Sequence, residues 1–448
     1  MDCVRPSRRP NCSVPIISWD RADLTCRVEQ ALTIAGRAVC QAIRDDPGQD
    51  PSASRALDFA APSAQSGAQP LILKKVVAEA TMLLRCVSSL AETEPRIGRS
   101  ITALAELLIP YAQGDWLKAS LFRDPGLALE DAAAYIQLSG LGYGDRCFDA
   151  LLGEILREGE VGGPERVPNH QLEHQWLRRI WREDSANETE LTALLSQTCI
   201  GRSLDVLGAN VLDLYAFTHV ILYATDMGQL QTVRWPRPVA EIVADAEAAL
   251  AVALDADNFD LGVELLWTWP MLRLPWSAAA TFGFGVAAAA QDAHGFLPGP
   301  AYSATDAEAL SADQRESYIL RTSYHSTFVM GFLCAAALRS GPAPPVIVTK
   351  SDADVDRLIS PLVQRHSKDA TWQDAFTHLD AAQQALLTGF VLSIVLRRAR
   401  SHQDLQLIRD CMKVALQLDG PQGPAVHQAL ALLRRAVLIS QLPVQDKA

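Results

Sequence analysis

The chain has 448 residues, which is too long for one simple helical bundle and suits two helical lobes or one large helical ring. Apolar residues make up 49% of it, enough for a sizeable core, and most are Ala and Leu, which favour helix over strand. The formal net charge of −12, without a long run of either sign, argues against nucleic acid and anionic lipid as partners.

The pattern of apolar residues and breaks divides the chain into three parts. Residues 1–20 are predicted to be disordered, and residues 21–70 to hold a helix near 26–44 and a linker rich in Pro, Ser and Ala. Residues 71–448 are predicted to form one large all-helical domain. Its helices are expected at 71–90, 100–109, 128–141, 145–158, 171–181, 211–227, 239–254, 258–269, 276–292, 317–338, 353–364, 381–398, 405–418 and 426–442.

The fold class follows from the period of the apolar residues. Alternation with period 2 never lasts beyond three or four residues, so only 345–348 is expected to be a short extended piece. No fixed repeat of roughly 30–50 residues recurs, which argues against a regular solenoid. Short connections between successive helices favour antiparallel neighbours. We therefore predict an all-α protein, either a ring or a two-layered bundle of antiparallel helical hairpins.

The segment LDLYAFTHVILYATDMG carries polar residues in an apolar helix. Tyr215, His219, Tyr223 and Asp226 are spaced by four, four and three residues, so they lie on one helical face. A buried imidazole and a buried carboxylate need partners, and together they suit acid–base chemistry. The alternative is a hydrogen-bonded network that only stabilises a helical core.

The segment DADNFDLGVELL places two carboxylates one helical turn apart. Asp257 or Asn258 is expected to cap this helix, and the helix dipole accounts for an acidic first turn. Asp260 and Glu264 repel each other unless a cation or a shared proton lies between them. Glu264 precedes an apolar run, so capping explains it less well than it explains Asp257 or Asn258.

Two further segments contain histidines. Tyr324 and His325 lie in an otherwise apolar helix, where a histidine is either a site residue or a hydrogen-bonded core residue. Residues 170–174 read His-Gln-Leu-Glu-His, the H-x-x-E-H pattern in which two histidines bind zinc and the glutamate acts as a base. This second segment is strongly polar and opens a helix, which favours an ordinary solvated turn.

Two segments resemble parts of the α/α toroids of terpenoid cyclases and protein prenyltransferases. AAAAQDAHGFLPGP, residues 287–300, is similar to a helix end and the Q-x-x-x-G-x-x turn that follows it. SYHSTFVMGFLCAAAL, residues 323–338, is similar to the inner helix after such a turn. Residues 255–258 resemble the D-x-D-D motif of class II cyclases except for Asn258 in the last place, and the magnesium motifs of class I cyclases are absent. The resemblance implies a helical ring around an apolar cavity.

We therefore expect an enzyme that acts by proton transfer on a hydrophobic small molecule bound in an apolar central pocket. The expected acids and bases are His219, Asp226, Asp260, Glu264 and His325. The residues expected to bind the substrate are Tyr215, Tyr223, Trp267 and Tyr324. One alternative is a helical protein that binds a partner or ligand without catalysis. Another is a metal-dependent enzyme with His219, Asp226, Glu264 or His325 as ligands; the sequence specifies no cofactor.

Composition also sets expectations about location. The nine cysteines form no C-x-x-C pair, which favours reduced thiols in a cytoplasm over disulfides or a zinc site. No apolar stretch reaches the roughly 20 residues that a membrane span needs. Abundant Ala and Arg with few Lys suggest a bacterium with a GC-rich genome and a role in specialised metabolism. The sequence leaves a homo-oligomer open.

Overall fold

Every element in the computed structural model is a helix within the residues that it describes, which are 19–45, 71–159, 165–182, 188–230, 232–340, 361–417 and 423–441. The all-α prediction is confirmed for these residues. The predicted extended piece at 345–348 and most of the predicted helix at 353–364 lie outside the described residues. None of the described helices is both long and apolar enough to cross a membrane.

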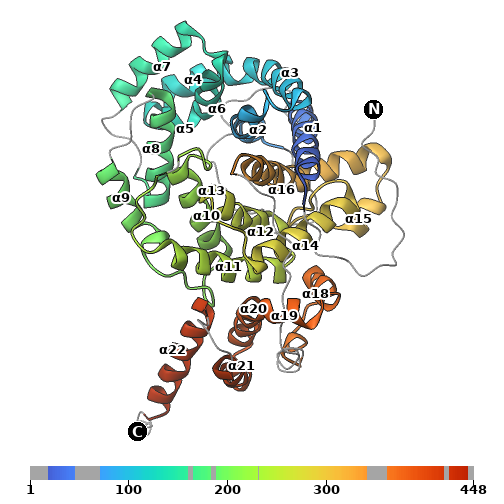
Figure 1. Ribbon diagram of the computed structural model, residues 1–448. Helices are drawn as coiled ribbons and strands as arrows, with labels where there is room; N and C mark the ends of the chain where they lie inside the picture. Colours follow the sequence, from blue (N-terminus) through green and yellow to red (C-terminus); the bar gives the residue numbers. More distant parts are fainter. Residues whose placement is uncertain are drawn as a thin grey trace, which may run out of the picture.

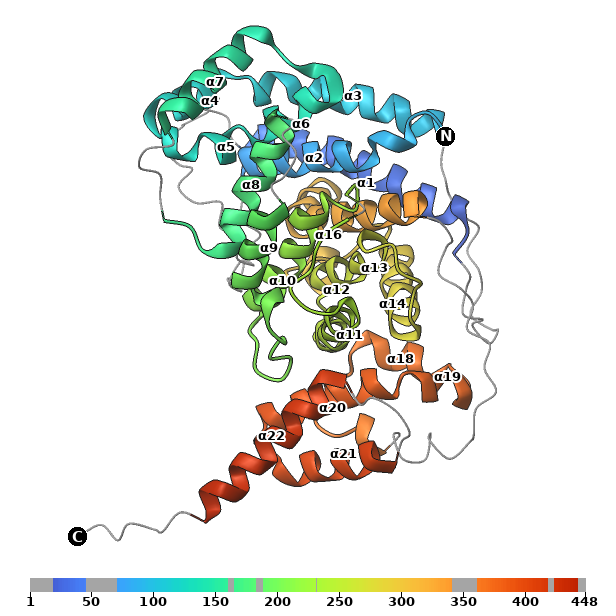
Figure 2. The ribbon, with the colours of Figure 1, turned by 60° about the vertical axis from the view of Figure 1, so that its left-hand side comes forward.

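The first part of the chain lies at the top of Figure 2, apart from α1 and α2, which reach toward the middle. Its elements are α1 (Arg21–Asp45), α2 (Leu73–Val87), η2 (Ser88–Leu90), α3 (Pro95–Ala112), α4 (Asp115–Arg123), η3 (Pro125–Leu127), α5 (Ala128–Asp131), α6 (Ala133–Leu138), η4 (Ser139–Tyr143) and α7 (Arg146–Gly159). The single helix predicted at 128–141 is therefore interrupted, and α4 was not predicted.

The central part carries most of the polar segments that the sequence singles out. Its elements are α8 (Pro168–Arg182), α9 (Glu188–Gln197), η5 (Cys199–Gly201), α10 (Val211–Thr225), α11 (Val239–Asp255), α12 (Phe259–Leu266), α13 (Thr268–Met271), α14 (Ala278–His294), α15 (Ala304–Glu308) and α16 (Ala312–Ser340). The last part lies below the rest in Figure 2, and α22 projects from it. It consists of α18 (Thr371–Thr377), α19 (Ala381–Leu386), α20 (Thr388–Ser401), α21 (Leu405–Gln417) and α22 (Gly423–Ser440).

A closed circuit of helices surrounds the middle of the molecule (Figure 1). In it α2 packs against α6, α6 against α8, α8 against α10, α10 against α12, α12 against α16, and α16 against α2. Other helices cover this circuit from outside: α1 lies along α16, α2 and α3, and α11 lies against α12, α14 and α20. The N-terminal helix is thus packed against the central helices.

Small residues allow the closest of these contacts. A Cβ atom on Gly331 in α16 would lie 2.4 Å from the Cβ atom of Ala31 in α1, so only glycine permits this approach. In α14 a Cβ atom on Gly283 would lie 3.0 Å from Leu250 in α11. The Ala- and Gly-rich helix α14 therefore packs closely against α11.

Local capping sets the ends of the two helices that carry the central polar residues. Asn210 and Asp213 form a capping box at the start of α10, and that helix ends where Asp226 adopts a left-handed conformation with φ 48°. At α12, the side chain of Asn258 accepts a hydrogen bond from the amide of Leu261, so Asn258, one of the two residues predicted as the cap, is the one that caps the helix. The cysteines among the described residues are all free thiols, also as predicted.

Candidate functional site

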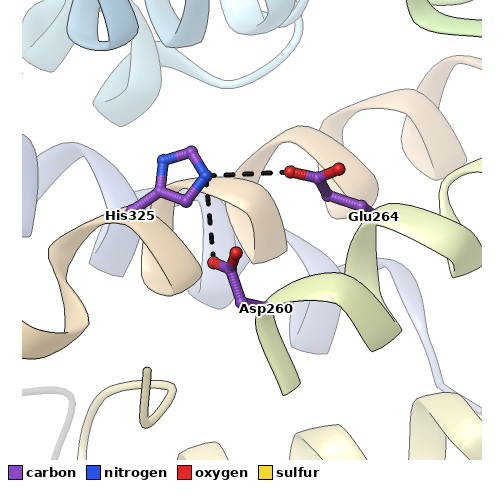
Figure 3. A group of neighbouring side chains, drawn as sticks. All are labelled: Asp260, Glu264 and His325. Carbon is purple, nitrogen blue, oxygen red and sulfur yellow. Dashed lines mark ion pairs between the residues drawn. The ribbon is translucent and has the colours of Figure 1, made fainter. Parts of the chain in front are cut away.

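Three ionisable side chains meet at the centre of the helical circuit (Figure 3). Asp260 and Glu264 project from successive turns of α12, and His325 approaches them from α16. The Nε2 atom of His325 lies 3.8 Å from Oδ1 of Asp260 and 3.7 Å from Oε1 of Glu264. Both carboxylates are buried, with exposed fractions of 4% and 5%. One oxygen or nitrogen atom from each of the three residues lies within 4.8 Å of the others, a spacing that suits a shared cation.

The other face of the imidazole meets a fourth residue, Glu79 of α2. Its Oε2 atom lies 3.2 Å from Nδ1 of His325, and the side chain is buried. Lys75 lies 3.8 Å from the Oε1 atom of Glu79, and Tyr324 hydrogen-bonds to the same carboxylate. Sequence reasoning missed Glu79, although a glutamate inside the apolar run KKVVAEATMLL was a usable signal. A buried carboxylate from α2 therefore lies beside the imidazole.

Hydroxyl groups orient the two carboxylates of α12. The Tyr215 hydroxyl donates to Oδ2 of Asp260 at 2.7 Å, and the Ser326 hydroxyl donates to Oδ1 at 2.8 Å. The Thr218 hydroxyl donates to Oε2 of Glu264 at 2.5 Å. Each carboxylate is therefore held in one orientation by neighbours from α10 or α16, as the ligands of a metal site usually are.

The polar stripe predicted on α10 is confirmed for its first three members. The ring of His219 lies 6.3 Å from that of Tyr215 and 6.0 Å from that of Tyr223, measured between centroids. The Nε2 atom of His219 lies 3.7 Å from Oε2 of Glu264. His219 thus joins the same cluster from the side opposite to His325.

Charge interactions within this cluster stabilise the ionised forms. Burial disfavours a charged His325, but the charges of Glu79 and Asp260 outweigh burial and raise its pKa well above 6.5. Burial also opposes ionisation of Glu264, yet the two imidazoles lower its pKa to about 2. The pKa of Glu79 is lowered in spite of burial by His325 and Lys75, and that of His219 is raised in spite of burial by Glu264. Three carboxylates, those of Glu79, Asp260 and Glu264, therefore face the two imidazoles and Lys75 at this centre.

A small cavity of about 40 Å³ adjoins the cluster between α2, α6 and α8. Its volume is enough for at least one water molecule. Apolar side chains such as Met82 and Trp176 form much of its wall, and the carboxyl groups of Glu79 and Glu173 are among its polar lining. Glu173 hydrogen-bonds to Tyr223, and burial is the main cause of its raised pKa. The cavity therefore reaches the edge of the cluster at Glu79.

The remaining predicted site residues have other surroundings. Asp226 leaves the stripe, because the helix ends before it and its carboxylate binds Arg85 and Trp176, each at 2.7 Å. Tyr324 hydrogen-bonds to Glu79 at the edge of the cluster. Trp267 is buried and stacks on Phe332 with ring centroids 5.1 Å apart. The structure thus brings together four of the five predicted acids and bases and separates Asp226 from them.

The H-x-x-E-H segment lies in α8. Glu173 hydrogen-bonds to Tyr223, and His170 is exposed. Among the described residues, Asp260, Glu264 and His325 are the only acidic, histidine or cysteine side chains that bring three ligand atoms within 4.8 Å of one another. The H-x-x-E-H pattern singled out Glu173 but did not predict its contact with Tyr223. The hydroxyls of Thr218 and Ser326 were not predicted to belong to the cluster, because serine and threonine are common in helices without any special role.

The family model described as a domain of unknown function, DUF6895, matches residues 51–335, which is more than half of the chain. The chain therefore belongs to this family. No curated protein and no solved structure matches the sequence. The matched segment contains every member of the central cluster, from Glu79 to His325, and excludes α18–α22.

Proposed function

We propose that this protein is a metal-dependent enzyme that acts on a small, largely apolar molecule. A divalent cation would be held by Asp260, Glu264 and His325 in the middle of the helical circuit. The observation that carries the proposal is the convergence of these buried side chains within 4.8 Å of one another. Two carboxylates at i and i+4 repel each other, and a shared cation removes that repulsion.

The surroundings of the three ligands support a metal ion over a purely structural network. Histidines that bind metals usually donate their second ring N–H to a carboxylate, which fixes the ring and its tautomer. Glu79 occupies that position, since its Oε2 atom lies 3.2 Å from Nδ1 of His325 while Nε2 faces Asp260 and Glu264. A mixed set of carboxylates and imidazole suits zinc, manganese or iron.

The side chains around the cation would have separate roles in catalysis. When bound, the ion would polarise a substrate oxygen or lower the pKa of a water molecule. Tyr215, Ser326 and Thr218 hold the ligating carboxylates in position. His219 lies beside Glu264 as a group that can accept or donate a proton. The apolar wall of the adjoining cavity, with Met82 and Trp176, would exclude water and bind the apolar part of the substrate.

The closed helical circuit supports the toroid architecture that the sequence resemblance implies. In a toroid, inner helices direct side chains into one shared space, which is how residues from α2, α10, α12 and α16 would reach one substrate. We extend the proposal to a bacterial enzyme of specialised metabolism on the basis of this resemblance and of composition.

A second candidate is acid–base catalysis without a metal. The contacts that favour it are those of His219 and His325 with Glu264, which let the imidazoles and carboxylates neutralise each other directly. In that case the cluster would exchange protons with an apolar substrate and would show no affinity for divalent cations.

Metal binding by the full chain decides between these candidates. After removal of metals, Mn²⁺ is titrated into the wild type, Asp260→Asn and His325→Ala, with His366→Ala as a control because His366 pairs with Asp404 far from the cluster. We expect the wild type and the control to bind Mn²⁺ and the two cluster variants to bind it much more weakly. Absence of binding by the wild type, or equal binding by all four proteins, would contradict the metal proposal.

Catalysis is tested without knowledge of the substrate. Bacterial extract is incubated with the metal-loaded wild type or with Asp260→Asn, and small molecules are compared by mass spectrometry. We expect the wild type alone to consume an apolar compound. If neither protein consumes any compound, or both consume the same ones, the catalytic proposal fails and a binding protein is favoured.

A further inference from the structure

Gln137 of α6 places an amide group in the wall of the cavity between α2, α6 and α8. Its side chain is 1% exposed, and its Oε1 atom has no hydrogen-bond partner among the described residues. A buried amide oxygen without a partner is unfavourable, and a hydrogen-bond donor that binds to it removes this cost. The cavity therefore offers a position for a donor group of a ligand.

A second oxygen atom in the cavity lining has the same property. Glu130 of α5 accepts a hydrogen bond from Nε of Arg166 at 2.7 Å through its Oε1 atom. Its Oε2 atom is buried and has no hydrogen-bond partner among the residues that the structure describes. A carboxylate only accepts hydrogen bonds, so a ligand that pairs with Glu130 and with Oε1 of Gln137 must supply donors.

The charges of the cavity lining allow this donor to be a cation. Lys74 pairs with Asp131, and Nζ of Lys75 lies 3.8 Å from Oε1 of Glu79, so a carboxylate matches each ammonium group of the described lining. A hydrogen bond from a charged N–H group to a carboxylate oxygen such as Oε2 of Glu130 is stronger than one from a neutral group. A protonated amine therefore suits these acceptors better than an alcohol does.

The volume of the cavity limits the size of the group that it holds. About 40 Å³ corresponds to about three or four groups of the size of a water molecule. Met82, Trp116 and Trp176 supply apolar wall beside the two acceptors. A primary ammonium group on a short hydrocarbon has this size, and it carries three N–H donors.

We propose that this cavity binds a small primary amine in its protonated form, with Oε1 of Gln137 and Oε2 of Glu130 as the acceptors. This inference rests on the proposed function for the role of the amine as substrate, and it narrows the largely apolar substrate to one that carries an amino group. Glu79 connects the two sites, because it lines the cavity and its Oε2 atom lies 3.2 Å from Nδ1 of His325.

Three probes of nearly the same size and shape test the inference on the full chain: isopropylammonium, 2-propanol and acetone. Isopropylammonium supplies several hydrogen-bond donors, 2-propanol supplies one, and acetone supplies none. We expect the affinities, measured by ligand-observed NMR titration at pH 7, to fall in this order. Isopropylammonium should bind about 10–100-fold more tightly than acetone, because a hydrogen bond to a charged group is lost with acetone.

Substitutions of Gln137 test whether this residue recognises the amine. Gln137→Leu keeps the volume of the side chain and removes the acceptor, so the preference for isopropylammonium over acetone should fall at least several-fold. Gln137→Glu keeps an acceptor and should retain the preference. Gln384→Leu is the matched control, because the amide of Gln384 donates to the carbonyls of Phe376 and Leu379, outside the cavity lining.

The possible results separate this inference from the proposed function. Equal binding of isopropylammonium and acetone by the wild type, or binding of neither, would overturn the amine site, and so would an unchanged preference in Gln137→Leu. If Gln137→Leu fails to fold, the order of the three probes in the wild type decides. Titration of the same proteins with Mn²⁺ tests the metal proposal separately, since failure to bind Mn²⁺ leaves the amine site standing.

Discussion

Two regions of this protein bury charged groups in different ways. Between α11 and α20, Arg398 donates to Asp255 from one edge of its guanidinium, with Nε 2.9 Å from Oδ2 and Nη2 bound to Oδ1, and Trp372 donates to the same carboxylate at 3.1 Å. Arg398 also donates to the carbonyl of Val363 at 2.8 Å. One negative charge is matched there by one positive charge, and hydrogen bonds use the capacity of both groups.

The central cluster is arranged differently. Glu79, Asp260 and Glu264 face the imidazoles of His219 and His325, and Lys75 lies 3.8 Å from Glu79. Groups from four helices thus share their charges, whereas Asp255 and Arg398 form one bidentate pair. The comparison teaches that burial of charge alone does not mark a functional site, and that several titratable groups brought together from different helices are the stronger indication of one.

The largest change in the free energy of unfolding is expected when the pair of Asp255 and Arg398 is broken. Arg398→Ala leaves Asp255 buried without its counter-charge, and we expect it to reduce the free energy of unfolding by about 3–5 kcal/mol. Denaturant unfolding measures this change. Arg400→Ala is the control, because its half-exposed pair with Asp205 at 3.8 Å should contribute about 0–1 kcal/mol. Equal losses in the two variants would contradict the distinction between matched buried pairs and surface pairs.

The pair of Asp45 and Arg321 makes the free energy of unfolding depend on pH. Burial disfavours a charged Asp45, but hydrogen bonds from Arg321, the amide of Leu71 and Gln41 lower its pKa below 3.8. A lowered pKa in the folded state means that the ionised carboxylate stabilises the fold above pH 3.8 and that this contribution is lost as the pH falls through the lowered pKa. Asp45→Asn should therefore reduce the free energy of unfolding by about 1.5–3 kcal/mol at neutral pH.

The measurement for Asp45 is denaturant unfolding of the wild type and Asp45→Asn from pH 7 down to the acid limit of folding. The difference in free energy of unfolding between the two proteins should stay constant from pH 7 to about 4. It should become smaller at lower pH, where Asp45 of the wild type takes up a proton. A difference that does not change with pH would show that the charge of Asp45 is not what joins α1 to α16.

In the central cluster, removal of the Glu79 charge should change the affinity for Mn²⁺ more than the free energy of unfolding. Glu79→Gln keeps the shape of the side chain and removes the charge that faces Nδ1 of His325 at 3.2 Å and Lys75 at 3.8 Å, so the metal-free protein should lose some stability at neutral pH and still fold. We expect Mn²⁺ affinity to fall by about 10–100-fold, because the residue that orients a ligating histidine is changed. Calorimetric titration measures it, with Glu94→Gln at the half-buried pair with Arg21 as the control. Unchanged affinity would remove Glu79 from the site.

The smallest change in the free energy of unfolding is expected from substitutions in α22. Leu438 and Ile439 are 63% and 67% exposed, so replacing either with Gln should change the free energy of unfolding of the isolated chain by no more than about 0.5 kcal/mol. The same substitution at buried Leu407 in α21 is the contrast and should cost several times more. A large loss at Leu438 would show that α22 packs against other residues in solution.

Local spacing allowed the sequence to determine part of the site. The helical period places Tyr215, His219 and Tyr223 on one face, and it places Asp260 and Glu264 one turn apart. Capping residues likewise predict the start of α12, because a cap bonds to an amide only three residues away. The all-α class follows from the same periods and from the abundance of Ala and Leu.

Only the tertiary structure decided which of these polar residues belong together. Glu79 and His325 are far apart in the sequence and meet because α2 and α16 are neighbours in the helical circuit. Asp226 has the spacing expected for the polar face of α10. The helix ends there, because Asp226 adopts a left-handed backbone conformation, and its carboxylate pairs with Arg85. The reason is physical: periodicity fixes the direction of a side chain about its own helix, whereas the partner on the next helix depends on packing between distant segments, which no local pattern records.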